Sequence, residues 1–407
     1  MIMKAPDRMA EIEGGSRPGT TRVVAAKRPR SLVRTSKPQL GPAEARALAR
    51  VLKTGFLGMG PEVRAFEQEL ERYIGHDRRV LCVNSCTAAL HLALAAIGLR
   101  PGDEVLVPSI TYVASFQAVV MAGAKPVACD VLADSGLIDL DDARKRLTER
   151  TRAMMPVHFA GNTGDLAAIY AFAAAHGLRV IEDAAHAFGS TCDDIPVGGS
   201  GDIACFSFDP IKNITCGQGG AVVTADPAIV TSVDAMRNLG IEYPEPPAAG
   251  ADYTVRGPGW RYQMSDLMAC IGRVQLARFD TEIKPARQRL VEQYRERLGG
   301  IAGVGLLSTR PGTVAHIFPV RIARGRRDAV RDALSRARFE TRIHYQPNHR
   351  HPAFSGGAPL PVADLLYAEL MTLPTHAAVD AGHVEAIARV LEQHAGPAPG
   401  TGRGRTR

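Results

Sequence analysis

The sequence lacks the long apolar stretches that membrane proteins and secreted precursors carry. No apolar run in the 407 residues reaches the roughly 18 residues that a membrane-spanning helix needs. The N-terminal segment has arginines but no apolar core of a secretory signal, and it lacks the serine enrichment of a transit peptide. We therefore expect a soluble protein of the cytoplasm.

Cysteine pairs with metal-ligand or redox spacing are also missing. The seven cysteines are an odd number, they lie scattered in apolar runs, and none forms a C-x-x-C pair. Cys82 and Cys86 are four residues apart, but no second His or Cys pair completes a metal set. This usage predicts free thiols in a reducing compartment and no metal site.

The net charge of +7 comes from the two ends of the chain. Residues 1–36 carry a charge of +5 and residues 396–407 carry +3, which leaves about −1 for the body. Both ends are short of large apolar residues and have no helical period, so we predict disordered basic tails. The charge therefore gives no reason to place nucleic acid on the folded body.

The length exceeds the size at which one hydrophobic core usually stops growing, so two regions are expected. Residues 78–225 alternate short β-branched runs with alanine-rich helical runs, which predicts an α/β domain with a mostly parallel sheet covered by helices. The last two strand-like runs lie close enough in sequence for a hairpin. The predicted strands are 104–108, 125–131, 152–158, 178–184, 202–208 and 220–225, and the predicted helices are 87–98, 115–124 and 166–177.

A Pro- and Gly-rich stretch at 241–259 predicts a loop between the two regions. A long helix is expected over 265–299, with a break near Pro285, and the alternation after it suggests a smaller α+β domain. The predicted organisation is a tail at 1–36, a large domain at 37–250, a small domain at 251–395 and a tail at 396–407.

The run "LRVIEDAAHAFGS" places Asp183 at the end of a predicted strand and His186 three residues later. Ligands of open α/β sheets bind beyond the carboxyl ends of the strands, where Asp183 is expected. A helix N-cap explains Asp183 equally well when it is considered alone. A functional role requires a cation to pair with the carboxylate, and the protonated ring nitrogen of pyridoxal phosphate (PLP) is one.

The run "CFSFDPIKNITCGQGG" places Lys212 just after a strand-like segment and before a glycine-rich turn. A solvated turn lysine is the ordinary explanation. A desolvated lysine beside a cationic cofactor would instead lose its proton more easily and could attack a carbonyl.

Two further segments suit a cofactor of this kind. In "VNSCTAALHLALA" a strand leads through Asn84, Ser85, Cys86 and Thr87 into a helix, whose free N–H groups can bind a phosphate. Tyr112, which follows the strand at 104–108, could stack on a flat ring or simply belong to the core.

These motifs in this order resemble the DegT/StrS family of nucleotide-sugar aminotransferases, over residues from about Pro38 to 394. The resemblance implies the fold type I architecture of PLP-dependent transferases, with a large domain, a smaller α+β C-terminal domain and a homodimer that shares its active sites. The segments that carry it are "FLGMGPEVRAFEQELERYIG", "NSCTAALHLAL", "EDAAHAFGS", "FSFDPIKNITCGQGGAVVT", "GWRYQMSDLMACIGRVQL" and "RIHYQPNHRHPAF".

The resemblance also assigns roles. Lys212 would form the Schiff base with PLP, Asp183 would pair with the pyridine nitrogen, and His186 would lie near the phenolic oxygen of the ring. Tyr112 would stack on the ring, and His344 and Tyr345 would face the substrate. The residues matched to the phosphate are Thr87, Ala88 and Ser207, with Arg261 reaching it from the other subunit, and Cys86 is a further cofactor-binding residue.

Three positions depart from the family pattern. Asp209 stands where histidine is usual and Gln218 where glutamate is usual, which bears on substrate fit. Arg261 stands where the family lends asparagine across the dimer, and arginine is also a competent phosphate ligand.

The implied reaction moves an amino group from L-glutamate or L-glutamine to a keto-deoxyhexose linked to dTDP, UDP or GDP. The product would serve amino-sugar biosynthesis for a surface polysaccharide or a glycosylated natural product. One alternative is a PLP enzyme that acts on a cyclitol ketone. Another is a regulatory or nucleic-acid-binding protein on an inactive fold, which the intact pair of Lys212 and Asp183 disfavours.

Overall fold

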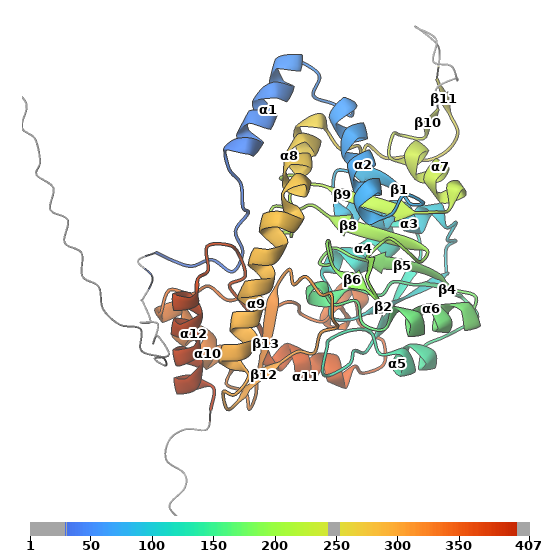
Figure 1. Ribbon diagram of the computed structural model, residues 1–407. Coiled ribbons are helices and arrows are strands. Elements are labelled where there is room, and N and C mark those ends of the chain that lie inside the picture. Colours follow the sequence, from blue (N-terminus) through green and yellow to red (C-terminus); the bar gives the residue numbers. More distant parts are fainter. Residues whose placement is uncertain (1–28, 30, 243–252, 397–407) are drawn as a thin grey trace, which may run out of the picture.

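The computed structural model describes residues 29, 31–242 and 253–396. A sheet with helices on both sides forms one part of the molecule, and a smaller region built around β13 (Phe318–Ile322) and α12 (Ala381–His394) adjoins it (Figure 1). Most of the predicted tails, 1–36 and 396–407, and the centre of the predicted loop at 241–259 lie outside the described residues.

The large region is built on a seven-stranded sheet in the order β1-β9-β8-β5-β4-β2-β3. Every neighbouring pair is parallel except those of β9, which runs antiparallel to both β1 and β8. The mostly parallel sheet and the β8–β9 hairpin confirm the predictions. The strands are β1 (Arg79–Val83), β2 (Glu104–Pro108), β3 (Lys125–Cys129), β4 (Thr151–Met154), β5 (Arg179–Asp183), β8 (Ile203–Ser207) and β9 (Gly220–Thr224).

Successive residues of a strand point to opposite sides of the sheet, and in these strands both sides carry buried apolar side chains. Helices therefore cover both faces of the sheet. In β5, for example, Val180 packs in the cluster that contains α6, whereas Ile181 packs in the cluster that contains α3. One face is covered by α3 (Cys86–Ala96), α4 (Val113–Met121) and α7 (Pro227–Met236). The other face is covered by α2 (Pro61–Ile74), α5 (Leu140–Lys145), α6 (Leu166–Ala175) and α8 (Asp266–Ala277).

The first described helix, α1 (Pro42–Thr54), packs on α8 through Ala47, Val51 and Cys270. The small region has an antiparallel three-stranded sheet, and its core includes Tyr294 stacked on Phe318 with ring centroids 4.9 Å apart. Its elements are α9 (Lys284–Leu298), β12 (Val304–Leu306), β13 (Phe318–Ile322), α10 (Arg327–Arg336), α11 (Pro361–Glu369), β14 (Leu370–Leu373) and α12 (Ala381–His394). Short elements are η1 (Phe159–Gly161), β6 (Thr191–Cys192), β7 (Ile195–Pro196), β10 (Ile241–Glu242), β11 (Thr254–Val255), η3 (Asn348–Arg350) and η4 (Pro352–Phe354).

The predicted long helix joins the two regions and is interrupted where a break was expected. A π-helical turn, η2 (Phe279–Ile283), separates α8 from α9, and Pro285 lies in the first turn of α9. α8 packs on α1 and α2, whereas α9 packs on α12. The domain boundary at residue 250 stays a prediction.

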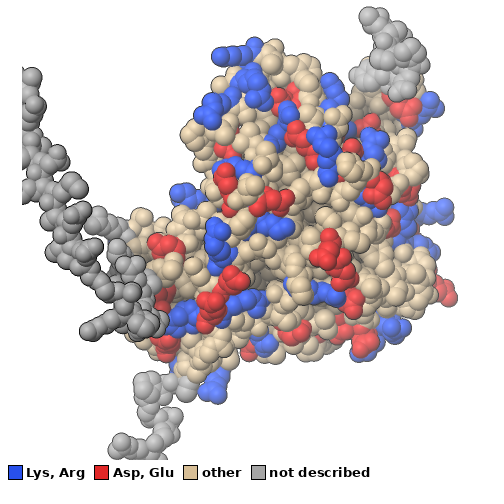
Figure 2. Space-filling model, viewed as in Figure 1, with Lys and Arg blue, Asp and Glu red and all other residues tan. Residues whose placement is uncertain are grey.

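Basic and acidic side chains are interspersed over the face shown in Figure 2. Among the described helices, none has the length and apolarity to span a bilayer. All seven cysteines are free thiols.

Candidate active site

A cavity of about 400 Å³ opens beyond the carboxyl ends of β5 and β8, and both regions of the fold contribute to its wall. Nine of the eleven residues predicted for the site line this cavity: Cys86, Thr87, Tyr112, Asp183, His186, Ser207, Lys212, His344 and Tyr345. The other two, Ala88 and Arg261, do not. Segments more than 250 residues apart in the chain therefore meet at one place.

Asp183 ends β5, and its carboxylate is 5% exposed. Its Oδ2 accepts a hydrogen bond of 2.7 Å from the Ser115 hydroxyl on α4, and its Oδ1 accepts one of 3.2 Å from the Ala185 N–H. No ion pair to Asp183 occurs within the described residues. A buried carboxylate that faces a cavity without a cationic partner is a binding site for a cation.

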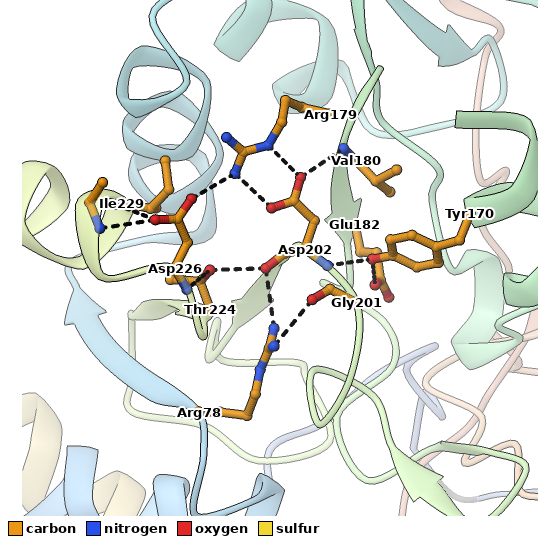
Figure 3. Close-up of polar contacts among 11 residues, drawn as sticks. Arg78, Tyr170, Arg179, Val180, Glu182, Gly201, Asp202, Thr224, Asp226 and Ile229 are labelled. Carbon is orange, nitrogen blue, oxygen red and sulfur yellow. Dashed lines mark hydrogen bonds and ion pairs between the residues drawn. The ribbon is translucent and has the colours of Figure 1, made fainter. Parts of the chain in front are cut away.

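A polar cluster at the opposite end of the strands fixes β5 against β8 (Figure 3). Arg179, at the start of β5, donates two hydrogen bonds of 2.7 Å to Asp202, which precedes β8. Tyr170 of α6 donates to Glu182 over 2.6 Å and accepts a hydrogen bond of 2.9 Å from the Asp202 N–H. These contacts stabilise the register of β5 against β8, in which Asp183 pairs with Cys205.

Lys212 lies in the turn after β8, is half-buried and lines the cavity together with Asp183. Burial lowers the pKa of its amine, although nearby Cys86, Asp183 and Asp209 act in the opposite direction. At a given pH, a lysine with a lowered pKa has a larger fraction of its amine in the neutral, nucleophilic form than a solvated lysine has. The turn that follows is close-packed: a Cβ on Gly220 would lie 2.5 Å from the carbonyl carbon of Ser85, so only glycine fits there.

His186 is buried between the two regions. Its Nδ1 accepts a hydrogen bond of 3.4 Å from the Ala160 N–H, so its Nε2 carries the proton and donates to the Tyr345 hydroxyl 3.0 Å away. Burial and the nearby charge of Lys212 hold the pKa of His186 well below its usual value, so the ring is neutral. Burial raises the pKa of Tyr345, which keeps its hydroxyl protonated.

His344 lies beside Tyr345 at the cavity wall. Its Nδ1 forms a hydrogen bond of 2.8 Å with the hydroxyl of Thr372 on β14. Burial, followed by the charge of Lys212, lowers the pKa of His344 to about 4. It is therefore a neutral hydrogen-bonding group at neutral pH.

The helix α3 begins at the cavity. The hydroxyl of Ser85, its N-cap, accepts a hydrogen bond of 3.1 Å from the Ala88 N–H. The first N–H groups of a helix have no acceptor within it, so those of Cys86 and Thr87 are suitable phosphate donors. Ser207 lines the cavity nearby, whereas the Ala88 N–H already has its partner.

Tyr112 is the N-cap of α4 and is 59% exposed. The centroid of its ring lies 5.8 Å from that of Tyr345.

Arg261 is exposed, and only its carbonyl reaches the start of α3, accepting a 3.4 Å hydrogen bond from Asn84. Asp266 binds the N–H groups of Gly60 and Val63, and no ion pair joins it to Arg261 among the described residues. The Arg261 side chain therefore adds no charge to the cavity of its own chain.

Sequence reasoning missed Ser115 and His316. Ser115 follows Tyr112 by one helical turn, which is the only local signal for it. His316 is 2% exposed, and its ring lies 4.6 Å from that of His186, although the two residues are 130 positions apart. No group of His, Cys, Asp and Glu side chains suited to a metal ion occurs within the described ranges.

The model of the DegT/DnrJ/EryC1/StrS aminotransferase family matches residues 38–392. The chain belongs to this family. It is 39% identical over 336 residues to a dTDP-3-amino-3,4,6-trideoxy-alpha-D-glucose transaminase of Streptomyces venezuelae, with coverage of 81% of this chain and 86% of that protein.

Solved structures agree with this assignment. DesV of S. venezuelae, in complex with a ketimine intermediate, is similar with a TM-score of 0.79 and 36% identity, over 86% of this chain and 93% of that one. The PLP form of the sugar aminotransferase Spr1654 of Streptococcus pneumoniae is similar with a TM-score of 0.82 and 26% identity, over 89% and 98% of the two chains. The protein has the type I fold of PLP-dependent transferases and is a transaminase, and its family and relatives imply PLP as cofactor.

Proposed function

We propose that this transaminase moves an amino group from L-glutamate or L-glutamine to the ketone of a nucleotide-linked keto-deoxyhexose. The name of the S. venezuelae relative, a transaminase of a dTDP-linked trideoxyglucose, supports this substrate class. The product would enter amino-sugar biosynthesis for a surface polysaccharide or a glycosylated natural product, and we place the enzyme in the cytoplasm.

The observation that carries the proposal is the unpaired, buried carboxylate of Asp183 in the cavity that Lys212 also lines. The residues present fit PLP: Asp183 for the ring nitrogen, Tyr112 for the ring face, and the start of α3 with Ser207 for the phosphate. When bound, PLP supplies an electron sink for the bonds of the substrate α-carbon. Asp183 would keep the ring nitrogen protonated, because neither Ser115 nor Ala185 neutralises its charge.

Lys212 would move the proton in each half-reaction. Burial lowers the pKa of its amine, which makes Nζ able to accept a proton from the substrate α-carbon and to return it later. Its position is set by its own N–H, which donates a 3.1 Å hydrogen bond to the Asp209 carbonyl. His186, neutral and bonded to Tyr345, would orient the phenolic side of the ring without adding a charge.

The substrate side of the cavity would be formed by His344 and Tyr345, which come from the small region. Apart from Lys212, no Lys or Arg is among the residues that line the cavity. Among the described residues, the anionic groups of the cofactor and substrates would therefore meet helix N–H groups and hydroxyls but no cationic side chain besides Lys212. A homodimer in which Arg261 of each subunit reaches the partner's phosphate would supply one.

The test is a substrate panel. The purified protein is incubated with ¹⁵N-labelled L-glutamate or L-glutamine and with keto-deoxyhexoses linked to dTDP, UDP or GDP. Mass spectrometry should show ¹⁵N in one nucleotide-linked sugar together with the 2-oxo acid. Amination of a cyclitol ketone, with none of any nucleotide-linked sugar, would overturn the proposed substrate class.

A further inference from the structure

Asp209 is an acid in the wall of the cavity that has no assigned role in the reaction. It follows β8 and Phe208, is half-buried, and lines the cavity between Ser207 and Lys212. Its backbone N–H donates to the Ser207 hydroxyl over 3.4 Å, and its Oδ1 accepts a 3.3 Å hydrogen bond from the Ile211 N–H. The side chain is thus held in an Asx-turn, which fixes where its carboxylate lies.

The Asx-turn alone would explain an Asp or Asn at this position, but it uses one oxygen only. The second oxygen, Oδ2, has no hydrogen bond to any residue that the structure describes, and no cation there lies within ion-pair distance of Asp209. The Asp209 carboxylate acts on the amine of Lys212 through space, in the direction that raises the pKa of this amine. Asp209 therefore presents an uncommitted anionic oxygen to the cavity.

Three other polar side chains of the cavity wall are already engaged within the chain. Asp183 is bonded to Ser115, His186 to Tyr345, and His344 to Thr372. Once Asp183 is paired with the cofactor ring, Asp209 is the acid that remains for a substrate. A carboxylate accepts hydrogen bonds from hydroxyl or ammonium groups and repels carboxylates and phosphates.

The two substrates of the proposed function differ in whether they bring groups that a carboxylate binds or groups that it repels. The amino-acid donor carries carboxylates, whereas the sugar ring near its ketone carries hydroxyls. We propose that Asp209 is a specificity-determining residue, which accepts a hydrogen bond from a ring hydroxyl of the keto sugar and disfavours the carboxylates of the amino-acid donor in this part of the cavity. This inference rests on the proposed function and deepens it.

The half-reactions can be measured apart by the absorbance of the bound cofactor in single turnovers. Asp209→Asn keeps the oxygen that closes the Asx-turn and removes the charge. We expect the second-order rate constant with the keto sugar to fall roughly ten- to a hundredfold, the effect of one charge-assisted hydrogen bond, and that with L-glutamate to stay within about threefold or to rise.

Asp139→Asn is the matched control. Asp139 is also half-buried, and its Oδ1 accepts a 2.9 Å hydrogen bond from the N–H two residues on, but it lies outside this cavity. Both half-reactions of this variant should match those of the wild type. A second arm uses keto sugars that lack single hydroxyls: removing the hydroxyl that Asp209 binds should slow the wild type but add little to the loss in Asp209→Asn.

Two outcomes would overturn the inference. Equal losses in both half-reactions, with a common shift of their pH profiles, would show that Asp209 acts through Lys212. An unchanged rate with the keto sugar would show that Asp209 serves the turn alone. Both are distinct from failure of the proposed function, in which the wild-type protein itself would not aminate any nucleotide-linked keto sugar.

Discussion

The hydroxyl of Ser115 donates a 2.7 Å hydrogen bond to Oδ2 of Asp183, which ties the first turn of α4 to the end of β5. The same turn begins with Tyr112, so one contact relates the residue proposed for the ring face to the residue proposed for the ring nitrogen. Ser115, which sequence patterns did not reveal, therefore ties the helical turn that carries Tyr112 to the carboxylate of Asp183.

Ser115→Ala tests this positioning. Loss of a hydrogen bond to a carboxylate costs about 1.5–3 kcal/mol, so we expect kcat/KM to fall roughly ten- to a hundredfold and the cofactor absorbance to shift. Thr231→Ala, which removes an exposed hydroxyl bonded to Pro227 on α7, is the control and should change neither. If Ser115→Ala retains activity within about twofold and an unchanged spectrum, Ala185 alone suffices to position Asp183.

Lys212→Ala should abolish transamination while the fold persists, because the replaced side chain borders a cavity and leaves no gap in the core. The wild-type protein should be yellow, and borohydride reduction followed by peptide mapping should find the cofactor attached at Lys212. Circular dichroism of the variant serves as the folding control. An active Lys212→Ala enzyme would contradict the assignment of this lysine.

Asp183→Asn keeps the shape of the side chain and removes its charge. The ring nitrogen should then lose its proton and the electron sink should weaken, so we expect the rate to fall by orders of magnitude while the phosphate still retains some cofactor. Rates and cofactor occupancy are measured together. A rate within about threefold of the wild type, a barrier change of only ~0.7 kcal/mol, would reduce Asp183 to a structural role.

These sites show what could be predicted from the sequence. Asp183, Ser207 and the start of α3 could be found because each ends or follows a buried run of regular period, and strand ends converge in an α/β fold. The contacts of His186 with Tyr345 and His316 could not, because they join segments 130 to 159 residues apart and depend on how the small region packs on the sheet. The reversed direction of β9 followed from the short connection between two strands.

The buried histidines give stability a defined pH dependence. The pKa of His344 is lowered to about 4 from an unfolded value near 6.5. Between pH 6.5 and 4, the unfolded chain therefore binds a proton at this residue that the folded chain does not bind. The pKa values of His186 and His316 are lowered for the same reason, burial. The contribution of these histidines to folding stability should therefore be full above pH 6.5 and should fall as the pH drops towards 4.

Urea unfolding at a series of pH values measures this loss. His344→Gln removes one of the titrating groups, so its free energy of unfolding should fall less steeply between pH 6.5 and 4 than that of the wild type. Thr231→Ala, which removes an exposed hydroxyl and no titratable group, should leave the slope unchanged. Identical slopes for all three proteins would show that His344 is not protected from protonation in the folded state.

The side chain of Arg261 does not line the cavity of its own chain. If each subunit lends this residue to the partner's phosphate, Arg261→Ala should weaken PLP binding by ~1.5–3 kcal/mol, roughly ten- to a hundredfold. Arg256→Ala, which removes another exposed arginine nearby, one paired with Glu242, is the control and should bind PLP normally. The decisive experiment mixes chains that carry Lys212→Ala with chains that carry Arg261→Ala at limiting PLP. In such a mixed dimer one site has both lesions and the other has neither, so two impaired proteins should regain activity together. If the chains exchange but activity does not return, Arg261 serves its own subunit or binds no phosphate.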